Sequence, residues 1–218
     1  MFFKDRREAG RLLAAQLTRY QSRPDVLVLG IPRGGMVLAA EVAHSLQAPL
    51  DVLLTHKIGA PFNPELAVGA VTEDGTVFLD EALIHQLGIP ARLVEWGKQA
   101  QLRDLARRAS RYRGGKAPLE RRDRIAILCD DGIATGSTTV AGLRALAAGQ
   151  PARRVLAAPV APSAVARRLA HECDEAVFLA TPEPFHAVGL FYAVFDQVSD
   201  EEVVELLRQA RERGVAGP

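Results

Sequence analysis

The stretch RIAILCDDGIATGSTTV, residues 124–140, decides the fold because it predicts a strand, an acidic turn and the start of a helix without a gap. Residues 125–129 form a continuous apolar run that is too short for a helix and is typical of a strand buried on both faces of a parallel sheet. Asp130 and Asp131 follow directly, where such a sheet positions its ligands. The stretch therefore predicts a ligand-binding corner between a strand and a helix.

The second half of this corner favours an anion. Small and hydroxylated residues at 134–139 lead into a helix with apolar side chains at helical spacing from Val140 onward. Unpaired amides of a first helical turn, the helix dipole and several hydroxyls would converge there, and Gly136 would let the backbone approach closely. Asp130 and Asp131 only accept hydrogen bonds, so they need a ligand with hydroxyl groups or a cation such as Mg²⁺. A sugar phosphate offers both kinds of group.

The segment ILCDDGIATGST, residues 127–138, resembles the signature of the type I phosphoribosyltransferases, and the overall pattern is closest to a bacterial group of predicted, uncharacterised members. The resemblance implies that Asp130 and Asp131 hold the ribose hydroxyls of phosphoribosyl pyrophosphate (PRPP), with Mg²⁺ bound together with PRPP near these acids. It assigns the 5-phosphate of PRPP to Ala134, Thr135, Gly136, Ser137, Thr138 and Thr139. An ordinary loop with a Ser or Thr helix cap is the alternative.

A second glycine-rich corner, GIPRGG at residues 30–35, also joins a predicted strand to a predicted helix. A guanidinium and exposed glycine amides fit a phosphate or pyrophosphate. In the family, the loop at this position binds the pyrophosphate of PRPP, which the resemblance assigns to Pro32, Arg33, Gly34 and Gly35. The family often has a cis peptide bond here, and the matching bond is Pro32–Arg33. Taken alone, this corner could be a plain turn.

The remaining pattern predicts an α/β protein with a central parallel sheet flanked by helices, and the resemblance implies that this is the type I phosphoribosyltransferase fold. We expect a single domain, residues 1–218, with its core at about 22–60 and 120–180. A β-hairpin and helical insertion is expected at about 61–119, and a small hood at about 181–198 precedes a C-terminal helix. Within these parts we expect strands at 25–30, 52–54, 154–160 and 175–179, a hairpin over 66–79, and a helical region at 81–113 that breaks near Gly88.

The resemblance also implies functions for two further regions. Residues 55–65 would form a mobile loop that brings a lysine to the pyrophosphate; Lys57 is our candidate, with His56 and Glu65 as weaker ones. A solvated surface lysine is the alternative for Lys57. In the hood, the aromatic side chains of Phe185, Phe191 and Tyr192 could stack on an acceptor base. A small satellite core beneath the hood explains them equally well.

Composition and the absence of other motifs argue against several other classes of protein. The chain has 218 residues and a net charge of +1, so no global field favours nucleic acid or acidic membranes. Neither a secretion signal nor a long apolar run is present, and we expect a cytoplasmic protein. No nucleoside-triphosphatase loop or dinucleotide fingerprint occurs. A basic cluster that could attract RNA is interpreted as a solvated helix face. Its members are Arg103, Arg107, Arg108, Arg111, Arg113, Lys116, Arg121 and Arg122.

The resemblance implies a Mg²⁺-dependent phosphoribosyltransferase that transfers the phosphoribosyl group of PRPP to a nitrogen acceptor, a nucleobase by preference, and releases pyrophosphate. A homodimer is compatible with the sequence, and Trp96 could either anchor its own helix or contact the partner. The main alternative is a PRPP-sensing regulator that binds RNA or DNA through residues 103–122 without catalysis; another sugar-phosphate enzyme ranks last. Hypoxanthine–guanine enzymes have an acid where this chain has Ala134, so we expect an acceptor other than these two bases, recognised by residues 181–195.

Overall fold

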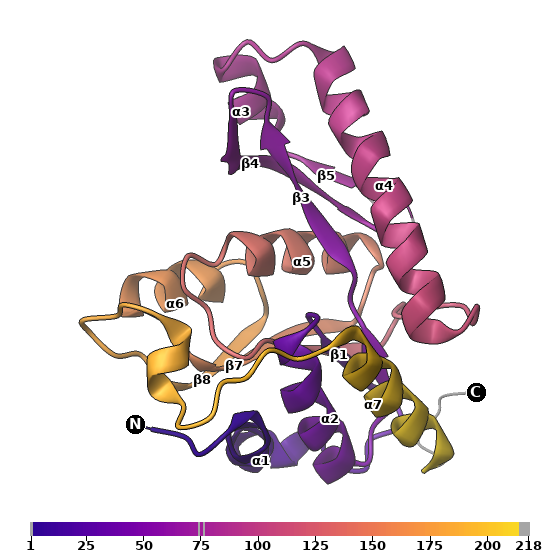
Figure 1. Ribbon diagram of the computed structural model, residues 1–218, viewed down its shortest axis with the longest axis vertical. Helices are drawn as coiled ribbons and strands as arrows, with labels where there is room; N and C mark the ends of the chain where they lie inside the picture. The colour runs from indigo at the N-terminus through magenta and orange to yellow at the C-terminus, as the bar shows by residue number, and fades with distance from the viewer. Residues whose placement is uncertain (1, 74, 76, 214–218) are drawn as a thin grey trace.

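The computed structural model describes residues 2–73, 75 and 77–213, except for the side chains of residues 64, 65 and 67. Asp74 in the hairpin turn and the side chain of Glu65 therefore lie outside the described residues. Figure 1 shows a lower core layered around one sheet and an upper lobe built on a second sheet. Within the described residues, no helix is long and apolar enough to cross a membrane.

The elements of the core alternate between strands and helices, as the sequence predicts. The helices of the core are α1 (Arg6–Gln16), α2 (Gly34–Leu46), α5 (Ser137–Ala148), α6 (Ser163–Ala170) and α7 (Asp200–Glu212), with short 3-10 turns η1 (Thr18–Tyr20) and η2 (Val188–Phe191). Its strands are β1 (Val26–Gly30), β2 (Leu50–Val52), β6 (Ile125–Cys129), β7 (Arg153–Val160) and β8 (Glu175–Ala180). Asp5 and Ser199 cap the N-termini of α1 and α7, where each side chain accepts a hydrogen bond from the amide three residues later.

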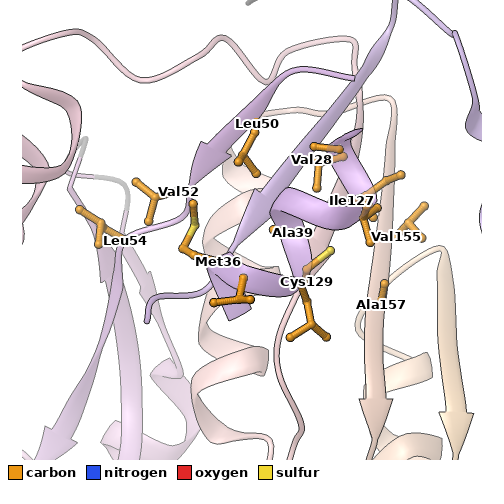
Figure 2. Close-up of a cluster of buried hydrophobic side chains, with 14 of the residues drawn as sticks. Val28, Met36, Ala39, Leu50, Val52, Leu54, Ile127, Cys129, Val155 and Ala157 are labelled. Carbon is orange, nitrogen blue, oxygen red and sulfur yellow. The ribbon is translucent and has the colours of Figure 1, made fainter. Parts of the chain in front are cut away.

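The five core strands form one parallel sheet in the order β2-β1-β6-β7-β8. All residues of β1 and β6 are buried, because helices cover both faces of the sheet. Figure 2 shows one of these packed faces, where Val28 and Ile127 of the sheet belong to the same buried cluster as Met36 and Ala39 of α2. The second strand was predicted at 52–54 but spans Leu50–Val52; Leu53 and Leu54 are buried beyond its end. Apolar character alone does not distinguish a strand from the buried segment that follows it.

The upper lobe consists of β3 (Thr55–Ala60), β4 (Asn63–Thr72), β5 (Val77–Leu79), α3 (Glu81–Gln86) and α4 (Ala91–Arg113). The three strands form an antiparallel sheet in chain order, with contacts to α5 below and α4 beside it. The predicted hairpin forms between β4 and β5. Residues 55–60, predicted as loop, pair with β4 instead, so the lobe begins at residue 55. The sequence did not predict this strand because Gly59 and two nearby proline residues are typical of loops. The pairing of the strand with β4 is irregular at Gly59.

A buried ion-pair network joins the lobe to the core. The Arg113 side chain at the end of α4 is 1% exposed, and its Nε lies 2.8 Å from Asp51 Oδ1 on β2. Its Nη2 lies 2.6 Å from Glu73 Oε1 beyond β4 and donates to the carbonyl of Val52 at 2.8 Å. Arg121 is also buried and lies 3.7 Å from Glu73. The interpretation of the basic cluster as a solvated helix face is therefore wrong for Arg113 and Arg121, because buried carboxylates from distant segments pair with them.

Replacing Arg113 with Met should destabilise the protein by about 3–5 kcal/mol, because the carboxylates of Asp51 and Glu73 would stay buried without their partner. Burial already raises the pKa of Glu73. Urea unfolding at pH 7 measures the change, with the exposed Arg103→Met on the same helix as the control. A loss below about 1 kcal/mol, in the range of surface pairs, would contradict the role of this network.

Candidate active site at the ends of β1 and β6

The two predicted anion corners lie side by side. Strands β1 and β6 are parallel neighbours in register, with Gly30 opposite Cys129. The amide of Ile31, just beyond β1, donates to the carbonyl of Cys129 at 2.9 Å. Parallel neighbours end at the same edge of a sheet, so the corners that follow them open on the same side. The pairing thus brings residues 30–35 and 130–139 together from distant parts of the chain.

Gly34 and Gly35 allow direct contact between these corners. A Cβ atom added to Gly34 would lie 1.8 Å from Asp131 Oδ2, and one added to Gly35 would lie 3.0 Å from the Asp130 Cα atom. Any side chain at Gly34 would displace the Asp131 carboxylate. These glycines therefore permit the contact between the start of α2 and the acidic pair.

The two acids differ in their surroundings. Asp130 is half-buried; its Oδ1 accepts from the amide of Asp131 at 3.0 Å, and its Oδ2 lies 3.4 Å from the Thr139 hydroxyl. Burial and the neighbouring Asp131 carboxylate raise the pKa of Asp130 well above its usual value. Asp131 has a cation partner, because Arg6 Nε lies 2.7 Å from Asp131 Oδ2. The site therefore holds one carboxylate with an arginine partner and one without a salt bridge among the described residues.

Arg6 was missed by the sequence analysis, although it supports the acidic pair directly. Its Nη1 donates to the carbonyl of Asp196 at 2.7 Å, and its guanidinium carbon lies 3.8 Å from the centre of the Phe195 ring. The chain before α1 also pairs with the hood: the Phe3 amide donates to the Phe191 carbonyl at 2.8 Å. In the sequence, Arg6 is the first residue of an amphipathic helix and resembles an ordinary surface arginine. Its role becomes visible only through its pairing with Asp131, which is distant in sequence.

The hydroxyl-rich loop forms the start of α5, as predicted. Gly136 caps the helix with a φ of 76°, in the left-handed region that favours glycine. The first helical hydrogen bond runs from the Val140 amide to the Gly136 carbonyl, so helix geometry leaves the amides of 137–139 without helical acceptors. Thr135 and Thr138 are exposed, whereas Thr139 is buried with its hydroxyl near Asp130. Arg168 of α6, also missed in the sequence, donates to the carbonyl of Thr135.

The other predicted site residues have different positions. The Pro32–Arg33 bond is cis, which confirms that expectation, and Arg33 is exposed at the end of the glycine corner. Lys57 lies within β3, opposite Ala70 of β4, and so belongs to the lobe and to neither corner. His56, its neighbour on β3, has Nδ1 3.1 Å from the Lys57 carbonyl.

The hood packs against the acidic corner, residues 130–132. Val188 contacts the backbone at Gly132, where an added Cβ would lie 2.3 Å from it. Tyr192 is only 5% exposed, packs against Phe3 and Phe195, and donates its hydroxyl hydrogen to the Asp131 carbonyl at 2.6 Å. Burial raises the pKa of Tyr192, so this donor stays protonated. Phe185 and Phe191 are half-buried, with ring centres 5.1 Å apart.

Comparisons with known proteins agree with this architecture. Residues 4–183 match the family described as phosphoribosyl transferase domain. Two Mycobacterium tuberculosis proteins, from strains CDC 1551 / Oshkosh and ATCC 25618 / H37Rv, are each 46% identical over 208 residues; the second is named "Putative phosphoribosyl transferase Rv0571c". The match covers 95% of this chain and 47% of each relative, so the chain spans about half the length of these curated relatives.

A solved structure is similar over nearly its whole length. The crystal structure of TT1426 from Thermus thermophilus is 41% identical, with a TM-score of 0.89, and the alignment covers 96% of this chain and 99% of that one. The chain belongs to the phosphoribosyltransferase family and has the type I fold that its signature segment predicts.

Substitutions of Asp130 and Arg6 should change stability in opposite directions. A carboxyl group with a raised folded-state pKa favours folding below its unfolded pKa, and this contribution is lost as pH rises through the folded value. Asp130→Asn should therefore raise the unfolding midpoint at pH 7–8 and lose this advantage near pH 3. Arg6→Met should lower stability by about 1.5–3 kcal/mol, because Asp131 loses its charged partner.

Thermal unfolding from pH 3 to pH 8 tests both substitutions. Arg7→Met is the matched control, since Arg7 is the exposed neighbour of Arg6 and pairs with Glu41 at the surface. A destabilised Asp130→Asn protein at pH 7, or an Arg6→Met protein as stable as Arg7→Met, would contradict the electrostatics described for the acidic pair.

Proposed function

We propose that this protein transfers the 5-phosphoribosyl group of PRPP to a nitrogen acceptor, a nucleobase by preference, and releases pyrophosphate. The observation that carries the proposal is the contact between the two corners at the ends of β1 and β6. One corner offers two carboxylates beside a helix start rich in amides and hydroxyls, and the other offers Arg33 and glycine amides. A ligand with a diol between two phosphate groups matches this order of acceptors and donors.

In this proposal each group of PRPP has a partner. The amides of 137–139 and the exposed hydroxyls of Thr135 and Thr138 bind the 5-phosphate at the positive end of α5. Asp130 and Asp131 accept hydrogen bonds from the ribose hydroxyls, and Arg6 and Tyr192 hold Asp131 in position for this contact. Arg33 binds the diphosphate, where negative charge grows as the bond to the sugar breaks. Lys57 would need to approach from the lobe to take part.

The residues present also fit a Mg²⁺ ion that is bound mainly through PRPP. No group of three or more His, Cys, Asp or Glu side chains among the described residues could hold a metal ion, so a cage made only of protein ligands is not available there. The Asp130 carboxylate lies half-buried at the corner without a salt bridge among the described residues. Mg²⁺ typically uses one or two carboxylates together with water and substrate phosphates. Bound this way, it would neutralise charge on the diphosphate.

The regulatory alternative has weaker support. It relies on a basic surface at 103–122, yet Arg113 and Arg121 are buried, and Arg107 and Arg111 pair with Asp104 and Asp200. Burial and pairing therefore remove four of the seven guanidinium groups of this segment from contact with a nucleic-acid backbone.

The acceptor is proposed to bind near the hood, because Val188 and Tyr192 lie against the acidic corner.

A turnover assay with labelled PRPP, Mg²⁺ and a panel of hypoxanthine, guanine, adenine, orotate and uracil tests this function. We expect pyrophosphate release with a base other than the first two, because Ala134 cannot exchange a proton with a 6-oxopurine. Asp131→Asn should reduce kcat/KM about 100-fold, as expected for lost charged hydrogen bonds, and more than Phe185→Ala does.

Glu212→Gln, at the end of α7, is the control for that series. PRPP binding without turnover of any base would favour the regulatory alternative. A preference for hypoxanthine or guanine would contradict the argument from Ala134.

A further inference from the structure

A cavity of about 360 Å³ lies beside the glycine corner, between the lobe and the core. Its lining consists of Arg33, of Asp104, Arg107, Arg108 and Arg111 from α4, and of Asp200 from the start of α7. The α4 residues follow one another at helical spacing, so they form a single face of that helix. The volume is typical of sites for small ligands. Arg33 therefore belongs both to the candidate PRPP site and to the lining of this cavity.

The lining carries a net positive charge. Four guanidinium groups face two carboxylates, and both carboxylates already have cation partners. Arg107 Nη2 lies 2.7 Å from Asp104 Oδ1, and Arg111 Nη1 lies 2.6 Å from Asp200 Oδ2. Asp200 Oδ1 also accepts from the Tyr112 hydroxyl at 2.6 Å. Arg111 Nη2 also lies 2.5 Å from Glu201 Oε1, outside the lining. The carboxylates around the cavity are therefore engaged with Arg107 and Arg111, and the other two positive charges of the lining have no carboxylate partner among the described residues.

Those two charges belong to Arg33 and Arg108. Neither has a carboxylate partner among the residues that the structure describes. Arg33 is exposed, and Arg108 is half-buried, with its Nη2 3.4 Å from the Tyr112 hydroxyl and its guanidinium carbon 5.7 Å from the Tyr112 ring centre. Each guanidinium has planar donors that suit two phosphate oxygens at once. Like charges gathered around one cavity favour an anion with several negative charges.

We propose that this cavity binds a polyphosphate anion, which competes for Arg33 with the diphosphate of PRPP. Two guanidinium groups from different elements suit an anion with at least two phosphates better than a single carboxylate. Asp104, Asp200 and Glu201 beside these arginines would repel an extended nucleic-acid backbone, whereas a short anion can contact Arg33 and Arg108 alone. The competition rests on the proposed function, whereas the anion site itself does not.

Calorimetric titration of Mg²⁺-free sodium tripolyphosphate into the protein tests the site. Arg108→Gln should weaken binding about tenfold through loss of one charged double contact. Asp104→Asn should strengthen it, because this change removes a negative charge and frees Arg107 for the anion. Arg103→Gln is the matched control: it is exposed on the same helix but outside the cavity, and should bind like the unmodified protein. Thermal unfolding verifies that each variant is folded.

Equal binding by Arg108→Gln and the unmodified protein would overturn the proposal, because the anion would then lie elsewhere, for example at 135–139. Tighter binding of a short RNA through the same arginines would also overturn it. We expect saturating PRPP to weaken tripolyphosphate binding, and simultaneous binding without loss of affinity would contradict the sharing of Arg33. Competition by pyrophosphate or by ATP distinguishes the reaction's own product from a nucleotide effector.

The two proposals can fail separately. If tripolyphosphate binds as expected but no base is turned over, the anion site stands and the proposed function does not. If turnover is found and Arg108→Gln leaves tripolyphosphate binding unchanged, only the anion site is wrong.

Discussion

The contact between Gly34 and the Asp131 carboxylate is the constraint on which the site depends. It exists because β1 and β6 are parallel neighbours in register, and because no side chain at Gly34 separates the two corners that follow them. A strand order in which β1 and β6 were not neighbours would leave the acidic pair and the glycine corner on different parts of the edge. Helices cover both faces of this sheet, and the buried pairs of Arg113 fix the lobe above it.

This arrangement brings together several charged groups that reduce the stability of the folded protein. Asp130 is ionisable and half-buried, and lies directly beside a second carboxylate. Arg6 and Tyr192 secure Asp131, and they come from the first helix and from the hood, at opposite ends of the chain. Groups that reduce stability and are still held in place by long-range contacts are typical of functional sites. The same reasoning applies to Arg33 and Arg108, whose charges have no carboxylate partner among the described residues.

Local signals predicted the core and both corners well. The apolar runs of β1 and β6 and the break at Gly88 depend on neighbours in sequence, and the structure agrees with them. The missed charged residues depend on distant partners: Arg113 is buried because Asp51 and Glu73 meet it, and Arg6 reaches Asp131 across 125 positions of sequence. Strand β3, in contrast, pairs with the strand that follows it directly, and was missed because glycine and proline residues interrupt its pattern. A charged residue read alone in sequence is most simply assigned to the surface.

The most direct test of the central claim is a crystal structure of the protein with PRPP and Mg²⁺. The account predicts that the 5-phosphate contacts the amides of 137–139, that the ribose hydroxyls face Asp130 and Asp131, and that the diphosphate lies against Arg33 and Gly34. Phosphate groups bound elsewhere, with both corners free of ligand at saturating PRPP, would contradict it.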